Sequence, residues 1–270
     1  MQVFPSVFVS HGAPTFAIEP GIAGPKLAAL GRALGKPRAV VVVSPHWMTA
    51  GVSVTSVQQP ETVHDFGGFP AALYDIEYPA KGAPELASLI VDRFKRAGWN
   101  ASLDATRGLD HGAWVPLLHM FPHADIPVLQ VSMPRSLDSQ SALRLGQALA
   151  WLGEEGVLVI GSGSLTHNLY EFRQGTTREE PYAREFAQWI RTAVQGGDAA
   201  RLVGALRDAP HAARAHPTAE HFLPLLVAAG AAPQALPVTV LEGGIEHGVL
   251  SMDSFVFGRA VILEAERQPA

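Results

Sequence analysis

The fold of this chain is decided by the stretch Arg38-Ala39-Val40-Val41-Val42-Val43-Ser44-Pro45-His46-Trp47. Its run of small and β-branched apolar residues has no polar alternation, which is typical of a strand buried on both faces of a sheet. Because Pro45 cannot donate to a sheet ladder and restricts the residue before it, we expect the strand to end at Ser44. His46 then follows at the carboxyl end of the strand, where ligands bind in open α/β sheets.

Further apolar strands and amphipathic helices alternate on both sides of this stretch, and they predict the α/β class. A strand over 3–9 and a helix over 25–34 precede it, which indicates parallel neighbouring strands. The 270 residues are 47% hydrophobic and contain no repeat or linker. We therefore predict a single domain, 1–270, with a central mostly parallel or mixed sheet flanked by helices and a metal site at the carboxyl edge of the strands.

The composition argues against several classes of function and limits the residues that could bind a metal. A net charge of −5 argues against a basic nucleic-acid face, and no apolar run is long enough to span a membrane. The first nine residues lack the features of a signal peptide, so we expect a cytoplasmic protein. With no cysteine, a metal must be held by His, Asp or Glu, and the chain has eleven histidines. Composition leaves the oligomeric state open.

Three histidines follow apolar strands and are expected at one edge of the sheet. They are His11, His46 and His167. We place His221 at the start of a helix over 219–229 that Thr218 caps. Neutral imidazoles that converge on one point can bind a metal at about 2.0–2.2 Å, and oxygen acceptors orient the rings. Candidate acceptors adjacent to histidines are Asp65, Asp110, Asn168 and Glu220.

Several other patterns are not expected to carry function. His119 and His123 have the spacing of a helical metal pair, but Pro122 lies between them. The turn at 161–164 lacks the pattern of a nucleotide-binding loop, and neither a helical zinc-protease motif nor a nucleophile elbow occurs. The remaining histidines predicted to lie in ordinary loops are His211, His216 and His247.

Six motifs in order make the chain resemble the class III extradiol ring-cleavage dioxygenases, in the branch similar to 4,5-DOPA extradiol dioxygenase. The resemblance extends over nearly the whole chain. The motifs are His11-Gly12-Ala13-Pro14, Ser44-Pro45-His46-Trp47, His64-Asp65-Phe66-Gly67-Gly68-Phe69-Pro70, Gly108-Leu109-Asp110-His111-Gly112-Ala113-Trp114, His167-Asn168-Leu169 and Glu220-His221-Phe222-Leu223-Pro224-Leu225.

This resemblance implies an Fe²⁺ enzyme that opens the ring of a catechol with O₂. It implies metal ligation by His11, His46 and His221. It also implies that His167 is the acid/base, counted as a fourth metal ligand in zinc-loaded members, and that His111 contacts the substrate or oxygen. His64 and the loop over 66–70 border the substrate in the family. From the residues themselves, we expect Trp47, Phe66 and Phe69 to suit a flat ring.

The third ligand position departs from the wider class, which uses two histidines and one carboxylate. Here it is His221, and on the predicted helix the neighbouring Glu220 is expected to point elsewhere. An all-imidazole site also suits Zn²⁺, which binds such donors more tightly than Fe²⁺. Zinc is therefore expected to compete for the site in purified protein. In the catechol reaction we expect the metal to act as a Lewis acid and His167 to move the proton.

Two other functions account for the same residues. A zinc-dependent hydrolase would use the same histidines to activate water. A binding protein without catalysis, similar to Memo-type proteins, would share the fold alone. The sequence does not identify the catechol.

Overall fold

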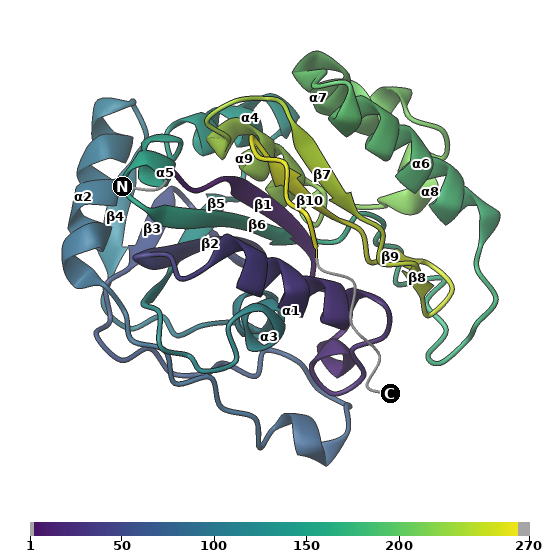
Figure 1. Ribbon diagram of the computed structural model, residues 1–270, viewed down its shortest axis with the longest axis horizontal. Helices are drawn as coiled ribbons and strands as arrows, with labels where there is room; N and C mark the ends of the chain where they lie inside the picture. Colours follow the sequence, from purple (N-terminus) through teal and green to yellow (C-terminus); the bar gives the residue numbers. More distant parts are fainter. Residues whose placement is uncertain (1–2, 264–270) are drawn as a thin grey trace.

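The computed structural model describes residues 3–263 and has a single-domain α/β architecture (Figure 1). Its central mixed sheet has eight strands in the order β4-β3-β5-β2-β6-β1-β10-β7. The strands are β1 (Ser6–Ser10), β2 (Ala39–Thr49), β3 (Val52–Thr55), β4 (Ala101–Asp104), β5 (Val128–Pro134), β6 (Val157–Gly163), β7 (Val238–Leu241) and β10 (Ser254–Phe257). A separate hairpin is formed by β8 (Ile245–Glu246) and β9 (Leu250–Ser251).

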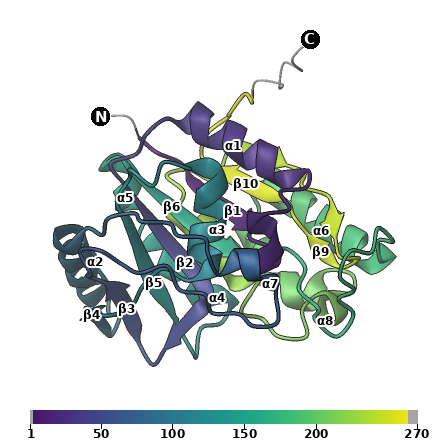
Figure 2. The same ribbon diagram turned by 90° about the horizontal axis from the view of Figure 1, so that it is seen from below.

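Helices cover both faces of the sheet (Figures 1 and 2). On one face α3 packs against β2 and β6, with α1 beside it, while α9 packs against β1, β2 and β6 on the other face and contacts α4. The α-helices are α1 (Ala23–Leu34), α2 (Pro84–Arg96), α3 (His111–Met120), α4 (Ser139–Gln147), α5 (Trp151–Glu154), α6 (Pro181–Gln195), α7 (Ala199–Asp208), α8 (Ala212–Ala215) and α9 (Leu223–Ala231). None of those in the described residues combines the length and apolar character needed to cross a membrane.

The parallel centre of the sheet brings the carboxyl ends of four strands to one edge. β5, β2, β6 and β1 are neighbours that all run in the same direction, and β10 and β7 continue the sheet antiparallel to β1. Helix α9 lies so close to this centre that a Cβ on Gly161 would stand 2.0 Å from the carbonyl oxygen of Pro224. Glycine at 161 thus lets the helix approach the end of β6.

The organising strand does not end at Ser44, as its sequence predicted. β2 continues through Pro45 and His46 to Thr49. The ladder with β5 is interrupted between Val43 and Met48, and pairing with β6 stops at Val43. Pro45 therefore lies where no ladder hydrogen bond is required of it, which is how a strand accommodates proline at an irregularity. His46 therefore lies in the irregular segment of β2 and not in a loop beyond the strand.

Two helices begin beside predicted site residues. Helix α3 begins at His111 itself, within the motif over 108–114. A distant carboxylate stabilises this start, because Asp65 Oδ1 accepts the backbone N–H of His111 at 2.9 Å. The helix predicted from residue 219 begins instead at Leu223, which leaves His221 in the preceding turn.

Thr218 is not a helix cap in the structure. Its hydroxyl donates to Oε1 of Glu220 at 2.9 Å. Helix α9 has Pro224 in its first turn, a position that suits proline because the backbone N–H groups there have no partner within the helix.

Candidate metal centre

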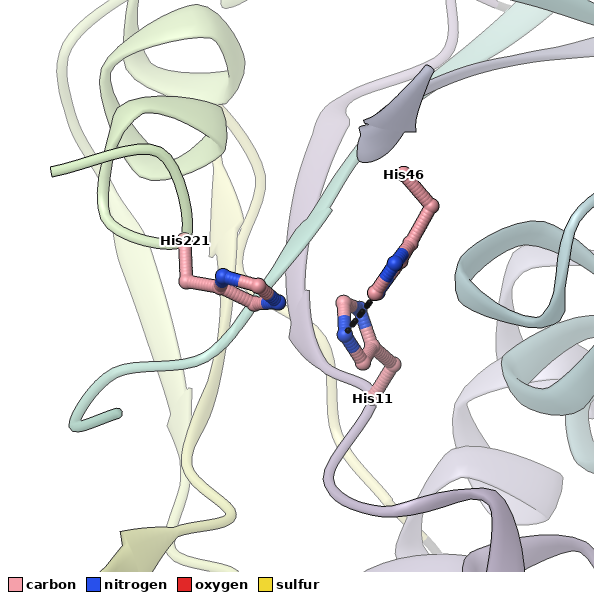
Figure 3. Close-up of side chains that lie close together, drawn as sticks. All are labelled: His11, His46 and His221. Atoms are coloured by element: carbon pink, nitrogen blue, oxygen red, sulfur yellow. Dashed lines mark hydrogen bonds between the residues drawn. The ribbon is translucent and has the colours of Figure 1, made fainter. Parts of the chain in front are cut away.

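Three of the predicted histidines meet at the carboxyl edge of the sheet (Figure 3). His11 follows β1, His46 lies in the irregular part of β2, and His221 comes from the turn before α9. Each offers a ring nitrogen, and these three atoms all lie within 4.8 Å of one another. The fold therefore joins residues that are far apart in the sequence into one cluster.

Each ring of this cluster has an oxygen atom beside Nδ1. The distances are 3.0 Å from His11 to Ser162 Oγ, 3.4 Å from His46 to Asp65 Oδ2, and 3.2 Å from His221 to Glu220 Oε1. An ionised carboxylate only accepts hydrogen bonds, so it favours a proton on the facing Nδ1. In the neutral imidazole the lone pair is then on Nε2, the nitrogen that metal-bound histidines often use.

The closest contact within the cluster has the spacing of two ligands on one ion. Nε2 of His11 and Nε2 of His46 are 3.2 Å apart (Figure 3). Two nitrogens, each about 2.0–2.1 Å from an ion at a tetrahedral angle, would be separated by about 3.3 Å. If both nitrogens carry lone pairs they repel each other, and a cation between them removes that repulsion. The donor set therefore fits a divalent metal.

Burial keeps these histidines neutral. It lowers the pKa of His11 and of His221 well below 6.5, and the neighbouring histidines lower both further. Burial, followed by the nearby His111, lowers the pKa of His46 to about 4. Neutral imidazole is the form that binds metal, because a proton on Nε2 would block the lone pair. The cluster is thus prepared for a cation at neutral pH.

His167, the predicted acid/base, and His111, predicted to contact the substrate or oxygen, lie beside the cluster. The ring of His167 stacks on that of His221, with 3.5 Å between ring centroids and an angle of 7° between planes. Burial lowers the pKa of His167 to about 4 against the opposing effect of Glu220. The ring of His111 lies 4.0 Å from that of His46, centroid to centroid. Both residues are therefore placed to reach a molecule bound at the cluster.

Asp65 connects His46 and His111. Its Oδ1 accepts from both the backbone N–H and Nδ1 of His111 at 2.9 Å, while Oδ2 faces His46. Burial alone would raise the pKa of this carboxyl, but the hydrogen bonds from His111 lower it to about 2. Asp65 is therefore ionised at neutral pH and fixes both rings through their Nδ1 atoms.

A cavity of about 380 Å³ opens over the histidines. Histidine side chains line one part, and apolar and aromatic side chains line the rest. The lining residues are His11, Gly12, Ala13, Pro14, His46, Phe66, Phe69, His111, His167, Leu169, Phe172, His221 and Leu250. An apolar cavity with a few convergent polar groups is typical of a small-molecule site. Phe66 and Phe69 form one wall, with their rings edge to face at 5.6 Å.

Two residues expected at the substrate do not line this cavity. Trp47 is buried, and the guanidinium of Arg107 lies 5.6 Å from its ring centroid. His64 lies behind Phe66, with 5.8 Å between ring centroids, and its Nε2 donates to the carbonyl oxygen of Ile76 at 3.0 Å. A substrate role for these two residues stays a prediction, and the geometry favours Phe66 and Phe69 over them.

The candidate acceptors beside the histidines divide into two groups. Asp65 and Glu220 contact histidines of the cluster, so the expectation that Glu220 points elsewhere is wrong. That expectation assumed a helix at 220, whereas the chain forms a turn there. Asp110 instead accepts hydrogen bonds from Gln130 and Arg107, and Asn168 donates to the carbonyl of Arg214 and to Glu171.

Four of the five histidines that the sequence left without a function have contacts outside the cluster. His119 donates to the carbonyl of Phe16, and His216 donates to that of Leu165. The ring of His211 lies against Glu185, and His247 accepts from the backbone N–H of Gly175.

Sequence reasoning missed Ser162 and the apolar residues of the far wall. Ser162 was considered only as part of a glycine-rich turn, although its place at the end of a buried strand was a usable signal. Phe172 and Leu250 reach the cavity from segments without a distinctive motif, so only tertiary structure reveals them.

The matches to known proteins agree with this geometry. Residues 23–257 match the family described as the catalytic LigB subunit of aromatic ring-opening dioxygenase. The chain is 42% identical to a 4,5-DOPA dioxygenase extradiol of Beta vulgaris, over 93% of this chain and 95% of that protein. It is 38% identical to a protein of the same name from Escherichia coli, over 94% of each chain.

A solved structure has the same fold. It is that of an uncharacterized protein of Escherichia coli K12, with a TM-score of 0.78 and 33% sequence identity. The match covers 94% of this chain and 100% of the other.

Proposed function

Since the chain belongs to the LigB family of aromatic ring-opening dioxygenases, we propose that it is an Fe²⁺-dependent extradiol dioxygenase acting on a DOPA-like catechol. The observation that carries the proposal is the meeting of three neutral imidazoles at the base of an apolar cavity. Zn²⁺ suits the same donors and is expected to compete for them.

His11, His46 and His221 would hold the metal. When bound, it supplies a Lewis acid that lowers the pKa of a catechol hydroxyl and a template that holds ring and oxygen together. The apolar wall of Phe66 and Phe69 would bind the catechol ring and exclude water.

His167 would accept a proton from the catechol. Its pKa of about 4 keeps the ring neutral at pH 7, so a nitrogen lone pair is available. His111 would accept a hydrogen bond from the second catechol hydroxyl. Because Asp65 accepts the proton on Nδ1 of His111, Nε2 of the neutral ring is the acceptor. The carboxylate of Asp65 would then stabilise the proton that His111 gains. His167 would therefore accept a proton beside His221, and His111 would accept one beside His46.

The test is oxygen consumption after reconstitution. Metal-free protein is loaded anaerobically with Fe²⁺ and mixed with L-DOPA, 3,4-dihydroxyphenylacetate or 4-methylcatechol, and O₂ uptake and the absorbance of a yellow ring-opened product are followed. We expect one O₂ consumed for each ring opened with at least one of these catechols. Neither uptake nor product with any catechol would contradict the proposal, and ester hydrolysis by Zn²⁺-loaded protein would instead favour a hydrolase.

Asp65→Asn is expected to weaken metal binding about 10- to 100-fold, the usual effect of removing an acceptor that orients a metal-bound histidine. The amide loses the charge that faces Nδ1 of His46 and His111. The dissociation constant for Zn²⁺, measured by competition with a chelating dye, checks this. Asp125→Asn is the control, because it removes a carboxylate paired with Lys36 at the surface. Equal affinities in the two variants would contradict the role of Asp65.

A further inference from the structure

Ser162 lies behind the ring of His11. It occupies the end of β6, opposite Val9 in the parallel ladder with β1. Its side chain is fully buried, and Oγ is 3.0 Å from Nδ1 of His11. Asp65 and Glu220, which occupy the equivalent positions beside His46 and His221, are carboxylates and can only accept. A hydroxyl is different, because it can either donate or accept.

A second contact determines whether the hydroxyl of Ser162 donates to His11 or accepts from it. Its Oγ is 2.5 Å from the carbonyl oxygen of Gly112, and a carbonyl oxygen can only accept. The single proton of the hydroxyl is therefore used on Gly112, and Oγ presents a lone pair to His11. Nδ1 of His11 must then carry the proton. Its Nε2 is left with the lone pair, directed at His46 Nε2.

The carbonyl of Gly112 is free for this contact because of Pro116. In an α-helix the carbonyl of residue 112 accepts from the N–H of residue 116, and proline has no N–H. Gly112 also lets α3 approach β2 closely, since a Cβ there would be 2.4 Å from Ser44 Oγ and 3.1 Å from His46 Cδ2. The proline inside the helix thus leaves an acceptor pointing at the end of β6.

We propose that Ser162 is a positioning residue that fixes His11 as its Nδ1–H tautomer, with Nε2 free for the metal. Ser162 acts only through His11 and does not line the cavity. The inference rests on the proposed metal site but not on ring cleavage. Protein that binds metal in this tautomer yet opens no catechol would contradict the proposed function and leave the role of Ser162 intact.

The tautomer of His11 can be measured directly in metal-free protein. Long-range ¹H–¹⁵N correlation spectra of ¹⁵N-labelled protein distinguish a protonated ring nitrogen from one with a lone pair, and His11→Gln assigns the signals by their loss. We expect protonated Nδ1 and unprotonated Nε2 in the unaltered chain. The opposite tautomer would overturn the proposal without any variant of Ser162. In Ser162→Ala we expect a mixture of both tautomers.

Metal affinity provides the second test, with a matched control. Ser162→Ala is expected to raise the dissociation constant for Zn²⁺ about 10- to 100-fold. Ser6→Ala is the control, because the hydroxyl of Ser6 is equally buried and donates to the carbonyl of Ala228 at 2.6 Å, with no histidine beside it. Both variants lose one buried bond between a serine and a carbonyl. Equal zinc affinities in the two, or unchanged affinity in Ser162→Ala, would overturn the role of Ser162.

Discussion

His46→Ala is expected to abolish metal binding at the histidine cluster. His46 supplies the nitrogen 3.2 Å from that of His11, and its ring also lies against those of His111 and His221. Removing one of three ligands leaves two imidazoles, and the ion would have to complete its coordination with water. We expect a loss of affinity beyond the about 100-fold that the loss of an orienting acceptor causes.

Equilibrium dialysis against Fe²⁺ or Zn²⁺, followed by metal analysis, measures this effect. The unaltered chain should retain one ion per chain and His46→Ala essentially none at the same free-metal concentration. His123→Ala is the control, because it removes an exposed imidazole on the chain after α3. If His46→Ala keeps one ion at the affinity of the unaltered chain, His46 is not a ligand.

The sequence predicted the architecture well because apolar runs report burial directly. The valines over 40–43 lie at the centre of the sheet, between the parallel strands β5 and β6, which both come later in the sequence. The expected strand before them, β1, is also parallel, but β6 lies between it and β2. The predicted end of β2 is wrong, because the prediction assumed that Pro45 ends the strand. Whether proline ends a strand depends on the ladder beside it, and that ladder is made by β5 and β6, which are distant in sequence.

The sequence indicated which histidines belong to the site, but it did not indicate which groups contact them. Strand ends placed His11, His46 and His167 at one edge, and the family resemblance added His111 and His221. The groups that orient these rings come from segments that are distant in the sequence. Asp65 reaches the first turn of α3 from a loop.

Glu220 and Ser162 show two reasons for the remaining differences. The predicted orientation of Glu220 is wrong because residues 220–222 form a turn and not a helix. Ser162 was missed because its role depends on the packing of α3 against β6, which brings the carbonyl of Gly112 to its hydroxyl.

His167→Ala is expected to keep the metal and lose turnover. Its ring stacks on the face of His221 and lies outside the group formed by His11, His46 and His221. The three proposed ligands therefore remain when His167 is removed. Loss of a positioned acid/base typically costs about 10²–10⁴-fold, and we expect kcat with Fe²⁺ to fall within this range while KM for the catechol changes little.

Metal content and rate, measured on the same preparation, separate the two roles that the family resemblance implies for His167. Full metal content with a low kcat would support a proton-transfer role, and an imidazole added to the medium should restore part of the rate. Loss of the metal would instead make His167 a fourth ligand, which the group of His167, Glu220 and His221 within 4.8 Å would allow. Turnover at the unaltered rate would contradict both roles and shift the proton transfer to His111, whose ring faces the cavity from the side of Asp65.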